Sequence, residues 1–131
     1  MLEILASLTP IDYSHLARVV QAEASRNTFD EYCVAASVLN RVKSDKFPNT
    51  VAKVVYQSRA YEGIYYQQGR PDSSLVKLLQ SEQGKSNIMH AYSLIGERTD
   101  FKGQTMLNYR VASEDPMCDP TGNFYHYYWQ T

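Results

Sequence analysis

One glutamate lies where the sequence predicts an apolar surface. Leu16, Val19, Val20 and Glu23 follow one another at the i, i+3, i+4, i+7 spacing that places side chains on one face of a helix. Glu23 is therefore a candidate for burial. Burial and a position near the C-terminal end of the helix dipole both disfavour a charged carboxylate, so we expect its pKa to be raised. A carboxyl group that stays protonated near neutral pH can act as a general acid.

A structural role is the alternative interpretation of Glu23. Glutamates in the last turn of a helix commonly point into solvent or pair with a nearby arginine, which here would be Arg18 or Arg26. Spacing alone favours this alternative, so the choice depends on the rest of the chain.

Other catalytic chemistries have little support in the motifs. His15, His90 and His126 are isolated, and no cysteine pair has zinc spacing, so we expect no metal site and no cofactor. Neither a Gly-x-Ser-x-Gly turn nor a phosphate-binding glycine loop is present. Carboxylate catalysis remains. Glycoside cleavage is the reaction class in which a neutral carboxylic acid protonates a leaving oxygen.

Composition limits the class of protein. At 131 residues we expect a single domain over residues 1–131 that carries the catalytic residue. The net charge of -1 gives no electrostatic reason to expect nucleic acid as a partner, and no apolar stretch approaches the ~18 residues of a membrane span. Eleven tyrosines are more than a core needs, and tyrosine suits stacking on sugars, although most of them fit a place in the core.

The two cysteines and the N-terminus bear on the compartment. Cys33 and Cys118 are too few for a disulfide framework, and we expect Cys33 to be a small buried hydrophobe, which is compatible with a reducing compartment. The N-terminus has no basic region of the kind found in signal peptides, so we expect synthesis in the cytoplasm without a signal peptide.

Helical patterns dominate the chain as far as residue 96. Capping residues and apolar periods predict helices over residues 14–25, 29–43, 51–56, 73–83 and 86–95, after a short apolar segment that stops at Pro10. Residues 57–71 are expected to form a functional loop. Runs at 105–111 and 124–129 are strand-like and predict an antiparallel pair. The fold class expected is α+β, mainly helical, with a small antiparallel sheet near the C-terminus.

Three segments resemble the catalytic domain of the SleB-type cell wall hydrolases, first known from spore-cortex lysis. They occur in the family's order, as LARVVQAEA at residues 16–24, VAASVLNRVKS at 34–44 and FPNTVAKVVYQ at 47–57. The resemblance covers about the first half of the chain. It implies a lysozyme-like fold shared with lytic transglycosylases. It also implies cleavage of the peptidoglycan strand between N-acetylmuramic acid and N-acetylglucosamine.

The resemblance also assigns residues. Glu23 occupies the position of the family's catalytic glutamate. Asn40 matches the asparagine of a Leu-Asn-Arg segment, where it orients substrate or the glutamate, or else serves as a buried structural amide; Arg41 is expected to be structural. The other candidates for substrate contact are the aromatic and acidic residues Tyr56, Tyr61, Glu62 and Tyr65. The family commonly continues Arg-Gly-Glu after the glutamate and alanine, where this chain has Ser-Arg-Asn, so a second acid is not expected there.

The leading hypothesis is a lytic transglycosylase, in which one carboxylate acts first as acid and then as base. A hydrolytic muramidase that uses Glu62 as a second acid is an alternative. An N-acetylmuramoyl-L-alanine amidase and a non-catalytic wall-binding or virion module are two others. Peptidoglycan is the expected partner. Relatives carry an export signal and a wall-binding domain that this sequence lacks, so we expect a phage enzyme delivered with other virion or lysis proteins to act on the wall.

Overall fold

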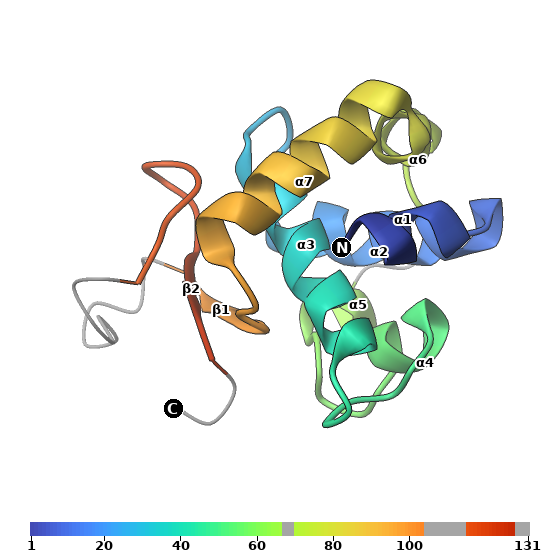
Figure 1. Cartoon of the computed structure of the whole chain (residues 1–131), viewed down its shortest axis with the longest axis horizontal. Coiled ribbons are helices and arrows are strands. Elements are labelled where there is room, and N and C mark those ends of the chain that lie inside the picture. Colours follow the sequence, from blue (N-terminus) through green and yellow to red (C-terminus); the bar gives the residue numbers. More distant parts are fainter. Residues whose placement is uncertain (67–69, 104–114, 128–131) are drawn as a thin grey trace.

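The computed structural model describes residues 1–66, 70–103 and 115–127, and it has a helical body with a two-stranded sheet at one side (Figure 1). The helices are α1 (Leu2–Ser7), α2 (Pro10–Glu23), α3 (Asp30–Lys43), α4 (Val51–Val55), α5 (Gly63–Tyr66), α6 (Ser73–Gln80) and α7 (Glu82–Ile95), and the strands are β1 (Asp100–Lys102) and β2 (Phe124–His126). The expected α+β class is confirmed. No helix within the described ranges is both long and apolar enough to cross a membrane.

Helix α3 is the centre of the body. All its residues from Asp30 to Arg41 are buried, and it contacts α2, α4, α7 and β1. Small side chains such as Ala35 and Ala36, both fully buried, allow neighbouring helices to approach closely. The predicted bounds of this helix are confirmed.

Helix α2 begins at Pro10, four residues before the predicted start. Thr9 is its N-cap: the Thr9 side chain accepts from the Asp12 N–H, and the Asp12 carboxylate accepts from the Thr9 N–H. Proline is well tolerated at the first helical position because the N–H it lacks would have no partner there. The prediction that Pro10 only stops the preceding segment was therefore wrong. Because the helix ends at Glu23, this residue lies at its C-terminal end.

The boundary between α6 and α7 also differs from the prediction. The helix predicted over 73–83 was expected to end just before Gly84, but α6 ends at Gln80 and the Ser81 side chain caps α7 by accepting from the Gly84 N–H. A Cβ at Gly84 would lie 1.8 Å from the carbonyl oxygen of Leu78. This glycine therefore allows the first turn of α7 to pack against the end of α6.

Strands β1 and β2 are antiparallel, with Phe101 opposite Tyr125. The predicted strand at 124–129 is confirmed over Phe124–His126, while the predicted strand at 105–111 lies outside the described residues. The partner strand Asp100–Lys102 was missed because three residues are too few to show an alternating pattern. The expected loop over 57–71 contains a short helix, α5, which contacts α2.

Cys33 and Cys118 form a disulfide. Cys33 is fully buried, as expected, but the expectation that it is only a small free hydrophobe was wrong. The two cysteines are separated by 85 positions, and a single pair at that distance gives no pattern that a sequence can reveal. The disulfide ties α3 to the segment that leads into β2.

Candidate active site

Glu23 is the last residue of α2 and lines a pocket of about 610 Å³. The pocket is formed by the end of α2, by Arg41 of α3, by the segment 59–63 before and at the start of α5, and by Phe101 and Lys102 of β1. Elements far apart in sequence therefore meet around one carboxyl group.

The environment of Glu23 favours its neutral form. Glu23 is partly buried, and burial raises the pKa of its carboxyl group. The Gly63 N–H donates a hydrogen bond to the carboxylate, which lowers the pKa, and the negative charge of Glu62 raises it. Because burial is the largest effect, the pKa is raised overall. The expected environment of a general acid is thus present.

Gly63 is in close contact with this carboxyl group. A Cβ on residue 63 would lie 2.9 Å from Glu23 Oε1 and 3.2 Å from the Ala22 Cβ. A side chain at this position would therefore push the carboxyl group aside. The absence of a side chain lets the backbone N–H approach Glu23 directly.

A buried polar cluster holds the backbone of Glu23. Asn123 Nδ2 donates to the Glu23 carbonyl oxygen at 3.1 Å and to Asp30 Oδ2 at 2.7 Å. The Tyr125 hydroxyl donates to Asp30 Oδ1 at 2.6 Å. Burial raises the pKa of Asp30, while the hydrogen bonds from Tyr125 and Asn123 lower it. Asp30 and Asn123 therefore link β2 to the end of α2.

Sequence reasoning missed Asp30 and Asn123 as parts of the site. Asp30 stands at the start of a predicted helix, where an acidic residue is an ordinary cap, and Asn123 comes next to the strand-like run at 124–129, so neither position indicated the site. The two residues are separated by 93 positions.

Arg41 and Tyr61 form the wall of the pocket beside Glu23. The Arg41 guanidinium lies 4.8 Å from the ring centroids of both Phe47 and Tyr61. Its Nε donates to the Thr99 carbonyl oxygen at 2.8 Å, and it forms an ion pair with Asp100. Arg41 thus has two aromatic contacts, a hydrogen bond and an ion pair within the protein, which fits the structural role expected for it.

Tyr61 and Glu62 lie in the same pocket as Glu23. Tyr61 is 4% exposed, and its ring stacks on Phe101 with centroids 6.2 Å apart. Burial raises the pKa of its hydroxyl. Glu62 is exposed, and because it lines the same pocket it remains the candidate for a second acid.

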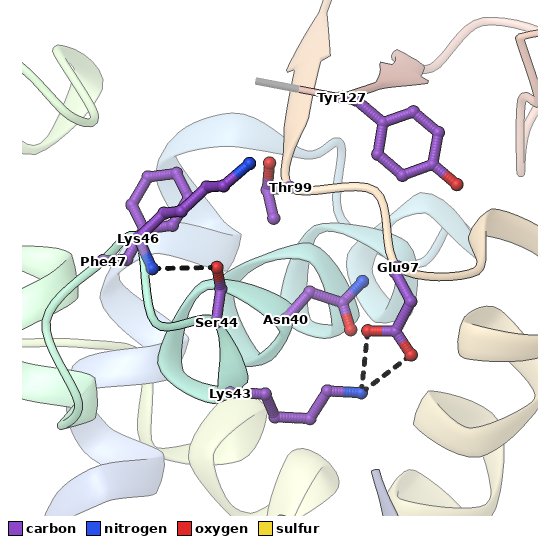
Figure 2. Close-up of a pocket in the computed structure, with 8 residues that line it drawn as sticks. All are labelled: Asn40, Lys43, Ser44, Lys46, Phe47, Glu97, Thr99 and Tyr127. Carbon is purple, nitrogen blue, oxygen red and sulfur yellow. Dashed lines mark hydrogen bonds and ion pairs between the residues drawn. The ribbon is translucent and has the colours of Figure 1, made fainter. Parts of the chain in front are cut away.

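Asn40 lies in a separate pocket of about 330 Å³. Figure 2 shows its side chain above the ion pair of Lys43 and Glu97, in which Lys43 Nζ lies 3.2 Å from Glu97 Oε2. Asn40 Nδ2 donates to the carbonyl oxygens of Gly96 and Arg98 at 2.8 and 2.7 Å. These bonds fasten α3 to the turn after α7. They match the structural alternative stated for Asn40, and the structure does not bring it into the pocket of Glu23.

The remaining candidates are also placed apart from Glu23 or are not described. Tyr56 is 43% exposed, and its hydroxyl lies 2.8 Å from His15 Nδ1, so it belongs to a different surface from the pocket lining. The side chain of Tyr65 lies outside the described part of the structure. Among the residues that are described, no group of three His, Cys, Asp or Glu side chains is arranged to hold a metal ion.

Comparisons with known proteins agree with this architecture. A family model described as cell wall hydrolase matches residues 27–131. The catalytic domain of the Bacillus cereus SleB protein is similar, with 22% identity, a TM-score of 0.59 and coverage of 87% of this chain and 88% of that one. The catalytic domain of a germination-specific lytic transglycosylase, SleB from Bacillus anthracis, has 22% identity, a TM-score of 0.56 and coverage of 90% and 95%. Comparison with curated protein sequences gives no match.

Proposed function

The chain belongs to the cell wall hydrolase family, and from this premise we propose that it cleaves the glycan strand of peptidoglycan between N-acetylmuramic acid and N-acetylglucosamine. The observation that carries the proposal is Glu23, a partly buried carboxyl group of raised pKa in a pocket walled by Tyr61 and Phe101. Aromatic walls suit sugar rings, and a neutral carboxylic acid suits protonation of a glycosidic oxygen.

We propose the lytic transglycosylase mechanism. The Glu23 carboxyl group donates its proton to the glycosidic oxygen as the bond to the muramoyl C1 breaks. The Glu23 carboxylate then accepts the proton of the muramoyl 6-hydroxyl as that oxygen bonds to C1 and closes a 1,6-anhydro ring. Glu23 is protonated again at the end, and no water is consumed. The burial that raises its pKa favours the first step, and one carboxylate serves both steps.

One observation supports the mechanism, and another supports the choice of Glu23 as the catalytic residue. The Bacillus anthracis structure that shares the fold is described as a lytic transglycosylase. The family match begins at residue 27, so the assignment of Glu23 itself depends on the pocket and on its chemistry.

The decisive experiment digests purified peptidoglycan with the wild-type protein and with Glu23→Gln, and identifies the products by mass spectrometry. We expect anhydromuramoyl ends from the wild type and none from the variant. Glu3→Gln is the matched control, because Glu3 is exposed on α1 and its removal changes the charge equally. Undamaged activity in Glu23→Gln would refute the mechanism. Peptidoglycan left intact by the wild type would refute cleavage and favour a wall-binding module.

Hydrolysis is a second candidate because Glu62 lines the same pocket. In that reaction Glu62 would activate a water molecule, and the products would carry reducing muramoyl ends. Glu62→Gln distinguishes the two mechanisms. A transglycosylase keeps forming anhydro ends when Glu62 is replaced, whereas a hydrolase loses its reducing ends.

A further inference from the structure

A row of three hollows extends from Glu23 toward Asn40. The pocket of Glu23 adjoins a middle hollow of about 370 Å³, and this middle hollow adjoins the pocket of about 330 Å³ that Asn40 lines. The middle hollow shares lining residues with both neighbours: Arg41, Arg59 and Ala60 with the Glu23 pocket, and Lys46 and Phe47 with the Asn40 pocket. The three hollows are therefore parts of one groove.

Consecutive residues of the chain line the three hollows in turn. Thr99, which directly precedes β1, lines the Asn40 pocket, and Asp100 lines the middle hollow. Phe101 and Lys102 line the pocket of Glu23. Because a strand rises about 3.3 Å per residue, the path from Thr99 to Lys102 covers about 10 Å. The groove thus has the extended form that suits a linear polymer.

The far end of the groove contains two buried polar atoms without a partner. Within the part of the chain that the structure describes, neither Asn40 Oδ1 nor Thr99 Oγ1 has a hydrogen-bond partner. The two residues are 1% and 6% exposed, and both line the pocket drawn in Figure 2. Buried polar groups are nearly always paired in folded proteins, because leaving them unpaired is costly. Two such atoms in the lining of one hollow indicate that a bound molecule supplies their partners.

These atoms define the chemistry of that molecule. Both protons of Asn40 Nδ2 are already donated to backbone carbonyl oxygens, so Asn40 Oδ1 can only accept a hydrogen bond. The Thr99 hydroxyl can donate or accept. The rings of Phe47 and Tyr127 are also in the lining. A sugar residue fits this set, because it carries O–H and N–H donors on a body that packs against aromatic rings.

We propose that the Asn40 pocket is a distal sugar subsite, in which Asn40 Oδ1 and the Thr99 hydroxyl bind an N-acetylhexosamine residue of the glycan strand that Glu23 cleaves. The inference rests on the proposed function. Its volume of about 330 Å³ lies in the range of small-molecule sites, roughly 300 to 1,000 Å³. A strand seated at Glu23 follows β1 through the middle hollow into this pocket. A long strand therefore fills the pocket, and a short one leaves it empty.

The test compares two substrates that differ in length. One is the tetrasaccharide with a single bond between N-acetylmuramic acid and N-acetylglucosamine, which has one disaccharide on each side of that bond and fills only the first two hollows. The other is the long glycan strand, and both are freed of stem peptides by an amidase. The measured quantity is kcat/KM per cleavable bond on long strands divided by kcat/KM on the tetrasaccharide, so general damage to the enzyme cancels. We expect the wild type to favour long strands.

Two variants probe the pocket. Thr99→Val replaces the hydroxyl by a methyl group of similar shape, and it keeps the backbone carbonyl oxygen that accepts from Arg41 Nε. We expect the ratio to fall by about three- to tenfold, the range of one lost hydrogen bond, through a higher KM on long strands. The urea midpoint should not fall, because the hydroxyl has no partner among the described residues. Ser44→Leu places a larger side chain in the lining of the same pocket and should lower the ratio at least as far.

Thr28→Val is the matched control. Its hydroxyl donates to the Ser25 carbonyl oxygen at 2.8 Å, and Thr28 lies outside the described lining of all three hollows. The same chemical change should therefore lower the urea midpoint and leave the ratio unchanged. Stability and chain-length preference should thus move in opposite ways in the two threonine variants.

Each outcome has one meaning. A lower ratio in Thr99→Val and Ser44→Leu, with an unchanged ratio in Thr28→Val, supports the subsite. An unchanged ratio in both pocket variants, or a wild type without preference for long strands, overturns the subsite and leaves the proposed function standing. If the wild type cleaves neither substrate, the proposed function is refuted and the subsite with it.

Discussion

Reduction of the Cys33–Cys118 disulfide is expected to lower the free energy of unfolding by about 2 to 4.5 kcal/mol. The bond closes a loop with a sequence separation of 85. The chain-entropy model gives a loss of about 4.5 kcal/mol for a loop of this length, and residual structure in the unfolded chain reduces the observed value. An effect of this size is a large part of the stability of a small domain.

Urea titration of the oxidised and the reduced protein measures this difference. We expect a lower midpoint in the presence of reductant, and a larger m-value because the reduced chain exposes more surface when unfolded. The variant Cys33→Ala/Cys118→Ala is the control: reductant should leave its midpoint unchanged. If thiol titration finds that two thiols have been released while the midpoint stays the same, the reasoning is wrong.

The activity should respond to the same reduction. Cys118 precedes Asn123 by five positions, and Asn123 donates to the Glu23 carbonyl oxygen. Releasing the segment from α3 therefore loosens a contact to Glu23, the proposed catalytic residue, as well as the fold. We expect kcat to fall under reducing conditions at urea concentrations where the protein remains folded. Unchanged kcat would show that the segment holds its place without the disulfide.

Three further predictions concern the site. Because folding raises the pKa of Glu23, the folded state binds the proton of this carboxyl group more tightly than the unfolded state does. The stability that this proton contributes is lost as the pH rises through the folded pKa. Urea unfolding between pH 4 and 8 should therefore show the wild type losing stability relative to Glu23→Gln as the pH rises. Gly63→Ala should displace the carboxyl group and lower kcat by about 100-fold while circular dichroism stays unchanged. Asp30→Ala leaves the Asn123 and Tyr125 donors without their acceptor and should cost about 3 kcal/mol in urea unfolding, with a smaller loss for Asp30→Asn.

The contradicting outcomes of these three are distinct. A difference between wild type and Glu23→Gln that does not change with pH would mean that folding does not perturb the carboxyl group. Full activity in Gly63→Ala would mean that the carboxyl group has room to move. Equal stability of Asp30→Ala and the wild type would mean that the buried cluster is replaced by water at no cost.

The parts of the fold that local patterns determine were predictable. Helix α3 has apolar or small residues around most of its surface and capping residues before it, and its bounds were predicted from these features. The position of Glu23 on the apolar face of α2 followed from a spacing of seven residues, and its partial burial and raised pKa agree with that reasoning. Short-range spacing is enough for such features because a helix relates residues three and four apart.

Features that depend on distant residues were not predictable. Asp30 and Asn123 meet across 93 positions, and the disulfide joins residues 85 apart. Asn40 shows the same limit. Its place in the Leu-Asn-Arg segment suggested a substrate contact. In the structure its Nδ2 instead donates hydrogen bonds to the Gly96 and Arg98 carbonyl oxygens, in a turn more than 50 positions later.

Strand β2 explains how a single carboxyl group can be positioned accurately at the end of a helix. Through its pairing with β1, β2 holds Phe101 and Lys102 in the wall of the groove. Through Asn123, the residue just before it, the same strand holds the Glu23 carbonyl oxygen. Since Asp30 accepts hydrogen bonds from both Asn123 and Tyr125, one buried carboxyl group fixes the wall of the pocket and the backbone of Glu23 relative to each other. The backbone of Glu23, the proposed catalytic acid, is therefore held by this cluster, while its carboxyl group is contacted by the Gly63 N–H.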